Sequence, residues 1–524
     1  MKRKLPHGIQ DFAKLRQGGN VYVDKTDLIY QLITESESAN FFSRPRRFGK
    51  SLLCTTIEAI FQGRRELFQE IAGKPGLAID KLDWEWKKYP VILLALNSGE
   101  YLKGVDGFRG TLHYNLLEIA NTHNINLRGE DNPDKFKFLI KDLHEKYNEK
   151  VVIIIDEYDK PLLETVDNEE VHIEFRKILK GFYGILKEAD EFLRFAFITG
   201  VTKFSQASIF SDLNHLMDLT FDTDYASLCG LTQAEVEKNF KPEIDMVLKN
   251  NTISKDEYIE ELQAFYDGYR FTEKDIKVFN PFGLLHHFHF KGKFSPYWYN
   301  TGSPTFLIKL VKSQKIDITD LQNKRVAEDD FVNFDIENLS ALPILYQSGY
   351  LTISEYDSES KEYILDFPNL EVRSAFSRSL LSLINPDNSE VIAVKLITSA
   401  FIRGEAEKVL MIMRQFIAST PYDIIKNTEN FYHTVFHLIF SILGLDCRSE
   451  VRIVAGRIDT IVQTKKHIYC FEFKLDGSAE EALTQIDTKE YMIPFENKGK
   501  QLFKIGVNFN SEKRNIDDWK IKTT

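Results

Sequence analysis

Short apolar runs alternate with amphipathic stretches along the first 225 residues of the chain. The apolar runs cover residues 40–43, 91–96, 151–155 and 192–198, and helical periodicity lies near residues 51–61, 106–122 and 171–189. Strands that are apolar on both faces occur where helices cover both faces of a parallel sheet. The pattern therefore predicts a doubly wound α/β sheet of the kind that binds nucleotides.

The hydrophobic pattern changes after Leu231. Residues 232–235 form a capping box that opens a helix, and aromatic-rich sequence of weak periodicity continues to Trp298. We expect a mostly helical middle domain to begin here.

A helix near residue 342 is predicted to turn through Gly349 into a strand, and residues 362–367 would pair with that strand. This arrangement is typical of a winged helix. Residues 390–426 are again predicted to be helical, and from Glu429 a helix leads into strands and a final α/β unit.

Composition narrows the class of protein. The chain has 524 residues, of which 43% are hydrophobic, and four scattered cysteines that indicate neither a disulfide framework nor a zinc site. No run reaches the ~18 consecutive apolar residues of a membrane span. The net charge of -11 argues against a general nucleic-acid coat, although Lys and Arg outnumber Asp and Glu in the first 65 residues. We expect a soluble cytoplasmic protein without a membrane segment.

A phosphate-binding loop is predicted at Arg44-Pro-Arg-Arg-Phe-Gly-Lys-Ser51, between an apolar strand and a helix. Lys50 would contact the β and γ phosphates of a nucleotide, and Ser51 would bind Mg²⁺. Arg44 stands where such loops usually have glycine. The competing interpretation is a basic strand-to-helix loop without a ligand. The other loop residues expected to surround the nucleotide are Arg46, Arg47, Phe48 and Gly49.

A second element favours nucleotide binding. The apolar run at 151–155 ends in Asp156 and Glu157, as a Walker B strand does. Asp156 would hold Mg²⁺ and Glu157 would orient the attacking water. An apolar strand can also end in acids that merely cap a helix, but both elements occur here in the order that an ATPase requires.

The fourth predicted strand ends in Phe197-Ile-Thr-Gly-Val-Thr-Lys203. Thr199 could sense the γ-phosphate and Lys203 could offset its charge. A strand that simply turns at Gly200 explains the same sequence.

A second chemical site is predicted near the C-terminus, where Asp459 is followed after twelve residues by Glu472-Phe-Lys474. Side chains alternate along a strand, so Glu472 and Lys474 share one face while Phe471 and Phe473 pack on the other. Asp459 and Glu472 could bind Mg²⁺, and Lys474 could position water or offset charge, as phosphodiester hydrolysis requires. An exposed amphipathic strand would show the same alternation, but these neighbours are too apolar for one.

Four further polar residues could support that site. Glu450, on the preceding strand, is expected to join Asp459 and Glu472 as a metal ligand, and Gln485 would orient a ligand or water from the next helix. Glu429 and His433 lie one helical turn apart and could reach metal or phosphate. For those two residues, capping or packing of their helix is the stronger interpretation.

The ordered motifs resemble, over nearly the whole chain, a bacterial family that joins an AAA-ATPase-like domain to a PD-(D/E)xK nuclease-superfamily domain. Arg44 in the first glycine position belongs to the pattern of that family. The motifs lie at residues 5–12, 22–26, 44–51, 155–161, 199–205, 209–214, 266–269, 280–281, 297–302, 346–351, 367–372, 432–433, 450, 456–459, 472–474 and 485–486.

The resemblance implies a multidomain α/β fold. Residues 1–228 would form a P-loop parallel α/β sheet domain, residues 229–388 a helical and winged-helix-like middle domain, and residues 389–524 a helical lead-in and a restriction-endonuclease-like α/β domain. We expect ATP with Mg²⁺, or Mn²⁺ in its place, as cofactors and nucleic acid as partner, DNA before RNA. A homo-oligomer is left open.

The leading hypothesis is an ATP-binding and ATP-hydrolysing protein whose metal-dependent nuclease is regulated by nucleotide. One alternative is a nucleotide-dependent switch whose nuclease-like domain binds nucleic acid or a partner without cleavage. Another is a scaffold in which both sites are vestigial, because a superfamily fold does not by itself fix an activity.

Overall fold

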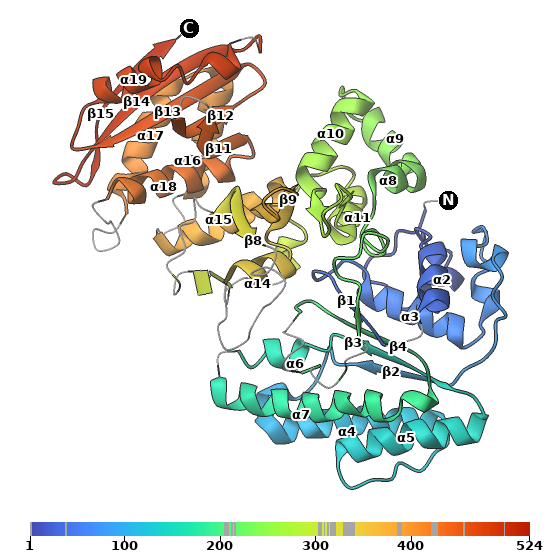
Figure 1. Ribbon diagram of the computed structural model, residues 1–524. Helices are drawn as coiled ribbons and strands as arrows, with labels where there is room; N and C mark the ends of the chain where they lie inside the picture. The colour runs from blue at the N-terminus through green and yellow to red at the C-terminus, as the bar shows by residue number, and fades with distance from the viewer. Residues whose placement is uncertain are drawn as a thin grey trace. The chain divides into compact units, whose positions relative to one another are not determined.

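The computed structural model is shown in Figure 1. It describes residues 3–36, 39–166, 168–203, 209–210, 213, 216–301, 307–308, 310–311, 314, 321–327, 341–384, 390–420, 428–453, 456–496 and 498–523. No helix among these residues is long and apolar enough to cross a membrane.

A five-stranded sheet forms the core of the N-terminal region. Its strand order is β2-β3-β4-β1-β5, and every neighbouring pair is parallel. This confirms the predicted parallel sheet and places β4 between the strand that leads to the phosphate-binding loop and the strand that ends in Asp156. The strands are β1 (Ala39–Ser43), β2 (Val91–Ala95), β3 (Val151–Asp156), β4 (Leu193–Gly200) and β5 (Met217–Asp218).

Helices cover both faces of this sheet. Figure 1 shows α4, α5 and α7 together on one face and α3 on the other. One of them, α5, was not predicted from the sequence, although its buried residues recur at helical spacing. The helices are α1 (Phe12–Gln17), α2 (Thr26–Glu35), α3 (Lys50–Phe61), α4 (Gly104–Thr122), α5 (Asn132–Tyr147), α6 (Lys160–Leu163) and α7 (Glu169–Glu188).

The middle region is helical, as predicted. Its first helix has the expected capping box, in which Thr232 and Glu235 each accept the backbone N–H of the other. Apolar side chains from its helices form one buried cluster that includes Phe240, Leu262 and Leu284. The elements are α8 (Gln233–Asn239), α9 (Lys241–Lys249), α10 (Lys255–Tyr266), β6 (Tyr269–Arg270), β7 (Lys277–Val278) and α11 (Pro281–His289).

The predicted helix, turn and strand pair around Gly349 is present. Helix α14 (Ala341–Gln347) leads through Gly349, whose φ is +87°, into β9 (Thr352–Asp357). Strand β10 (Glu362–Asp366) pairs with β9 in antiparallel register, and β8 (Lys324–Ala327) completes a three-stranded sheet.

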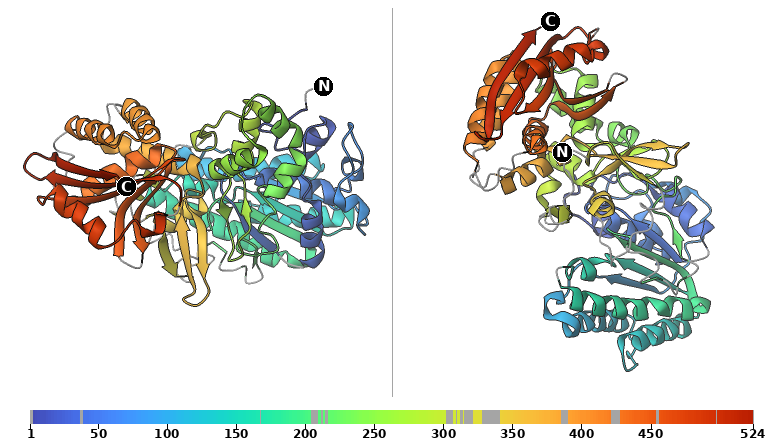
Figure 2. Two further views of the ribbon diagram at one scale, coloured as in Figure 1. Left: turned by 90° about the horizontal axis from the view of Figure 1, so that it is seen from above. Right: turned by 60° about the vertical axis from the view of Figure 1, so that its left-hand side comes forward.

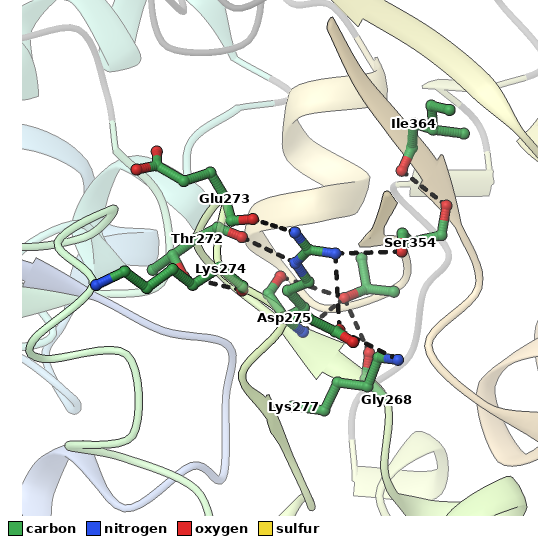
Figure 3. Close-up of polar contacts among 10 residues, drawn as sticks. Gly268, Thr272, Glu273, Lys274, Asp275, Lys277, Ser354 and Ile364 are labelled. Atoms are coloured by element: carbon green, nitrogen blue, oxygen red, sulfur yellow. Dashed lines mark hydrogen bonds and ion pairs between the residues drawn. The ribbon is translucent and has the colours of Figure 1, made fainter. Parts of the chain in front are cut away.

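We call α14, β9, β10 and β8 together the winged element. Arg270 connects it to the middle region by hydrogen bonds. Its backbone N–H donates to the Thr352 hydroxyl at 2.8 Å, and its guanidinium donates to the carbonyls of Thr272 at 3.0 Å and Ser354 at 3.3 Å. Figure 3 shows Thr272 and Ser354 together with the bond from the Ser354 hydroxyl to the Ile364 carbonyl, which joins β9 and β10. A charged group that satisfies several buried carbonyls fixes the position of both segments.

A second sheet of five strands forms the C-terminal region. Its order is β11-β12-β13-β14-β15, and only β13 and β14 run parallel among its neighbouring pairs. Helix α19 covers one face, and α16, α17 and α18 lie on the other (Figure 2). The strands are β11 (Asp446–Ile453), β12 (Gly456–Gln463), β13 (His467–Leu475), β14 (Gln501–Asn510) and β15 (Asn515–Thr523). The helices are α15 (Leu370–Ile384), α16 (Glu390–Arg403), α17 (Ala406–Ala418), α18 (Glu429–Ile442) and α19 (Ala479–Thr488).

Contacts divide the chain into two compact units. The first contains Met1–Trp298 and Arg325–Pro368, and the second contains Tyr299–Lys324 and Asn369–Thr524. The winged element therefore belongs to the unit that holds the parallel sheet, whereas α15 belongs to the unit that holds the second sheet. The three-domain division after residues 228 and 388 stays a prediction.

Candidate nucleotide and metal sites

The loop between β1 and α3 curves around the ammonium of Lys50. Lys50 is 6% exposed, and its Nζ donates to the backbone carbonyls of Arg44 at 2.8 Å and Pro45 at 3.0 Å. The loop turns through left-handed backbone at Arg47, with φ 68°, and Gly49, with φ 101°. Lys50 is the first residue of α3. The N-terminal backbone N–H groups of that helix, which favour anions, therefore belong to the same loop as the ammonium.

Arg44, in the usual glycine position, has a structural role. Its guanidinium lies between the rings of Phe42 and Phe271, each 4.2 Å away, and donates to the carbonyls of Thr220 at 2.9 Å and Tyr225 at 3.3 Å. Burial lowers its pKa to about 10. Residue 44 does not adopt left-handed backbone, so the loop needs no glycine there.

Of the remaining loop residues, Arg46 and Arg47 have exposed side chains, and the Arg47 guanidinium lies 5.2 Å from the Phe282 ring. Phe48 is buried edge-on against Tyr269, with 4.8 Å between ring centroids. Its side chain therefore packs into the protein, and Phe48 could serve a nucleotide only through its backbone.

Asp156 and Ser51 meet at the end of β3. Burial raises the pKa of Asp156, and a hydrogen bond from Ser51 and the charge of Lys50 partly offset that rise. Among the described residues, Asp156 Oδ1 is buried without a hydrogen-bond partner. A buried carboxylate oxygen without a donor is costly, and a divalent cation beside a hydroxyl would satisfy it.

Glu157 follows directly, in left-handed backbone with φ 54°. Burial and then the neighbouring charge of Asp156 raise its pKa. The side chain is only partly buried, so it stays accessible to water. A carboxyl with these properties is suited to accept a proton.

The predicted γ-phosphate residues both have protein partners. The Thr199 hydroxyl donates to the carbonyl of Phe42 at 2.7 Å, so it links β4 to β1. Lys203 Nζ pairs with Asp218 at 2.5 Å, and the Lys203 backbone N–H donates to Gln347 Oε1 at 2.9 Å. Their assignments to phosphate stay predictions.

Asp159 is a residue that sequence reasoning missed. Its Oδ2 accepts the backbone N–H of Val201 at 3.0 Å, the backbone N–H of Thr202 at 2.7 Å and the Thr202 hydroxyl at 2.6 Å. It therefore holds the loop after β4 against the end of β3. The signal was its place three residues after Asp156 in the same acidic motif.

In the second unit, Asp459 lies where β12 and β13 separate. The last paired position is Thr460 opposite Phe471, and beyond it Asp459 Oδ2 accepts the backbone N–H of Phe473 at 2.8 Å. The carboxylate thus occupies a position that a strand carbonyl would otherwise take. This bond fixes Asp459 beside Glu472 on the neighbouring strand.

Glu472 is 2% exposed, and its Oε1 accepts hydrogen bonds from Lys474 Nζ, at 3.2 Å, and from the Gln485 amide. Its Oε2 is buried without a partner among the described residues. Burial, and next the charge of Asp459, raise the pKa of Glu472 to about 7. The rings of the two flanking phenylalanines pack toward Phe436 on the opposite face, as the strand alternation predicts.

Helix α19 reaches this site because Gly506 lets it approach the sheet. Gly506 stands beside Glu472 in the register of β13 and β14. A Cβ there would lie 2.3 Å from the carbonyl of Ala479 on α19. The absent side chain allows the helix to bring Gln485 to Glu472.

Tyr491 is a second residue that the sequence did not reveal. It is buried, and its hydroxyl accepts a hydrogen bond from Gln485 Nε2 at 3.4 Å. Burial raises its pKa, and the charges of Glu472 and Asp459 add to the rise. The chain has 22 tyrosines, and the sequence spacing of Tyr491 from the site residues does not distinguish it from the others.

The remaining predicted residues differ in how the structure places them. His433 Nε2 donates to the backbone carbonyl of Asp459 at 2.9 Å, so it holds the backbone of Asp459 in position. Glu429 is exposed, and its charge contributes to the raised pKa of Glu472. Glu450 belongs to β11, but its side chain lies outside the described part of the structure. Within that part, no three His, Cys, Asp or Glu side chains form a group that could hold a metal ion.

Comparison with known proteins identifies both regions. Residues 6–210 match the family model described as predicted AAA-ATPase, and residues 427–519 match the model of the PD-(D/E)XK nuclease superfamily. An uncharacterized protein in the vnfD 5'region of Azotobacter chroococcum mcd 1 is 34% identical over 532 aligned positions, which cover 98% of each chain. No solved structure matches.

Proposed function

The chain belongs to the family that joins a predicted AAA-ATPase-like domain to a C-terminal PD-(D/E)XK nuclease-superfamily domain, and from this premise we propose an ATP-regulated, metal-dependent nuclease. Its substrate would be the phosphodiester bonds of nucleic acid, with DNA preferred to RNA. ATP would bind in the first unit and also be hydrolysed there.

One observation carries this proposal. Each predicted site contains a buried carboxylate oxygen that has no hydrogen-bond partner among the described residues, Oδ1 of Asp156 in one and Oε2 of Glu472 in the other. Buried polar atoms in proteins are nearly always paired. A divalent cation fits both positions, because each lies beside a second oxygen ligand, Ser51 in the first site and Asp459 in the second.

In the nucleotide site, Lys50 would exchange the loop carbonyls that it now contacts for the β and γ phosphates. Mg²⁺ held by Ser51 and Asp156 would supply charge neutralisation on the phosphates. Glu157 would orient the attacking water and accept its proton. Thr199 would keep β1 and β4 in register beside the γ-phosphate.

In the nuclease site, Asp459 and Glu472 would hold Mg²⁺ or Mn²⁺, with Glu450 as a further ligand. The ion would supply a Lewis acid for the scissile phosphate and lower the pKa of a bound water. Lys474 would offset developing negative charge. Gln485, itself bonded to Tyr491, would hold the carboxylate of Glu472 in position.

One set of assays tests the proposal. Single- and double-stranded DNA and RNA are incubated with purified protein, with and without ATP and with and without Mg²⁺. Wild type, Lys50→Ala and Asp459→Ala are compared. We expect cleavage that requires the divalent metal, disappears in Asp459→Ala and loses its ATP dependence in Lys50→Ala.

Other outcomes assign other functions. Nucleic-acid binding without cleavage under every metal condition would favour the nucleotide-dependent switch. Metal-dependent cleavage that persists in Asp459→Ala would refute the site assignment, and unchanged ATP affinity and cleavage in Lys50→Ala would refute the coupling.

A further inference from the structure

Two residues outside the N-terminal sheet hold the phosphate-binding loop. The Trp298 Nε1–H donates to the backbone carbonyl of Arg46 at 2.9 Å, and Trp298 is 4% exposed. Gly349 lies against the preceding loop residue, because a Cβ at Gly349 would be 2.8 Å from Cβ of Pro45 and 3.4 Å from the Trp298 ring. The loop is therefore fixed by an indole donor and by close packing.

The same winged element also contacts the loop after β4. Gln347, at the end of α14, accepts the Lys203 backbone N–H through its Oε1. Gln347 and Gly349 are two residues apart, so one short turn touches the loops that follow both β1 and β4. This turn and Trp298 therefore contact both loops between them.

Lys50 connects phosphate binding to these contacts. Its ammonium bonds to the carbonyls of Arg44 and Pro45, which directly precede the carbonyl that Trp298 holds. A phosphate would attract the ammonium by its charge and weaken both carbonyl bonds. The peptide unit released in this way is adjacent to the one fixed by Trp298.

The residue after Trp298 belongs to the second unit. There the Tyr299 backbone N–H donates to Glu371 Oε1 at 3.2 Å, and the Tyr299 hydroxyl donates to Ser379 Oγ at 2.7 Å. Both acceptors lie on α15. One peptide bond therefore joins a residue anchored on the phosphate-binding loop to a residue anchored on α15.

The chain passes from the first unit to the second unit again after Pro368, and this passage also leads into α15. Pro368 is the last residue of the first unit, and its carbonyl packs against Gly268, where a Cβ would lie 2.0 Å away. The next residue, Asn369, accepts the Val372 backbone N–H at 3.1 Å in the first turn of α15. Helix α15 is thus attached at two points to chain that is fixed in the first unit.

Contacts within the second unit continue from α15 to the nuclease site. Arg373 on α15 donates to the carbonyls of Leu445 at 3.0 Å and Cys447 at 3.2 Å, where β11 begins. Helix α15 also packs against α18, which carries His433 to the carbonyl of Asp459. Each step from Tyr299 to Asp459 is a direct contact between packed elements.

We propose that Trp298 is a positioning residue for the phosphate-binding loop, and that the Trp298–Tyr299 linkage passes the state of this loop through α15 to Asp459. This inference rests on the proposed function and specifies how nucleotide would regulate the nuclease. The ligand is a nucleoside triphosphate with Mg²⁺.

Hydrogen–deuterium exchange of the full-length protein tests the relay, with ATP and Mg²⁺ as the probe. In wild type we expect ATP to slow exchange of the loop at residues 44–51 and to change exchange of α15 by about fivefold. Lys50→Ala should lose both effects. Trp298→Phe keeps an aromatic ring but lacks the donor, and it should keep loop protection while losing the response of α15.

The matched control is Trp86→Phe, the same change in the same unit at a tryptophan whose ring packs against Phe68. It should respond as wild type does, and circular dichroism verifies that both variants are folded. Loop protection without any response of α15 in wild type would overturn the relay and leave ATP binding intact. An α15 response that survives in Trp298→Phe would overturn the role of Trp298. Absence of loop protection in wild type would refute the nucleotide site itself, and the relay with it.

Discussion

The carboxylate of Asp459 accepts the backbone N–H of Phe473 at 2.8 Å, at the point where β12 and β13 separate. This one side chain therefore serves two purposes. It closes a buried gap in the strand pairing, and it presents its remaining oxygen beside Glu472. The two purposes can be separated by substitution.

Asp459→Asn should preserve the fold and strongly reduce cleavage. Its amide oxygen can still accept the Phe473 N–H, but the negative charge that a metal needs is gone, and we expect cleavage to fall about 10³-fold. Asp459→Ala removes the acceptor as well and should cost a further ~1–3 kcal/mol of unfolding free energy. Cleavage rates and urea denaturation measure the two effects. An Asn variant as active as wild type would contradict the assignment.

Gly506→Ala should damage the nuclease site through packing alone. The added Cβ would meet the Ala479 carbonyl, so α19 must move away from the sheet and carry Gln485 from Glu472. We expect a loss of ~1–3 kcal/mol in unfolding free energy together with reduced cleavage. Gly110→Ala, in α4 with open space around it, is the control and should stabilise by ~0.5–1 kcal/mol. Equal effects in the two variants would contradict this reasoning.

Arg44→Gly restores the glycine of the more common phosphate-binding loop, yet we expect it to destabilise the first unit. The guanidinium fills the space between Phe42 and Phe271 and satisfies carbonyls that would lose their donor. The loss should be roughly 3 kcal/mol or more. Thermal denaturation followed by circular dichroism measures it, and a variant as stable as wild type would show that Arg44 is dispensable.

The raised pKa of Glu472 predicts the pH dependence of stability without metal. Between the ordinary value of 4.5 and about 7, the unfolded chain has lost the Glu472 proton while the folded chain still holds it. The folded state then binds more protons, so wild-type stability should fall relative to Glu472→Gln as pH rises through this window, and level off above it.

Denaturant titrations of both proteins across that pH range provide the measurement. Mg²⁺ competes with the proton, so its stabilising effect on wild type should grow with pH up to about 7 and be weak in Glu472→Gln. A difference between the two proteins that does not vary with pH would mean that Glu472 does not titrate in this window.

Much of the local structure followed from the sequence. The four apolar runs became four of the strands of the parallel sheet, because a strand buried on both faces must be apolar throughout. The alternation around Glu472 placed acid and lysine on one face and the flanking rings on the other. Helix α5 was not predicted, although its buried residues Phe136, Leu139, Ile140 and Leu143 recur at helical spacing.

The environments of the site residues did not follow from the sequence. Arg44 stands in a motif typical of phosphate contact and is instead enclosed by two rings, one of them 227 positions later in the chain, at residue 271. Lys203 pairs with Asp218, a partner that the sequence did not indicate, and its contact with phosphate stays a prediction. For His433, packing of its helix was favoured over contact with metal or phosphate, and the side chain donates to the backbone carbonyl of Asp459.

The sequence by itself determined which segments form strands and helices and where charged groups end them, because period and capping depend on residues a few positions apart. Only the tertiary structure decided that α19 would lie on Gly506, that Tyr491 would bond to Gln485, and that Trp298 would hold a carbonyl 252 residues away. These contacts depend on how whole elements pack against each other. Packing between elements that are distant in the chain produces no periodic pattern in the sequence, so the sequence does not predict it.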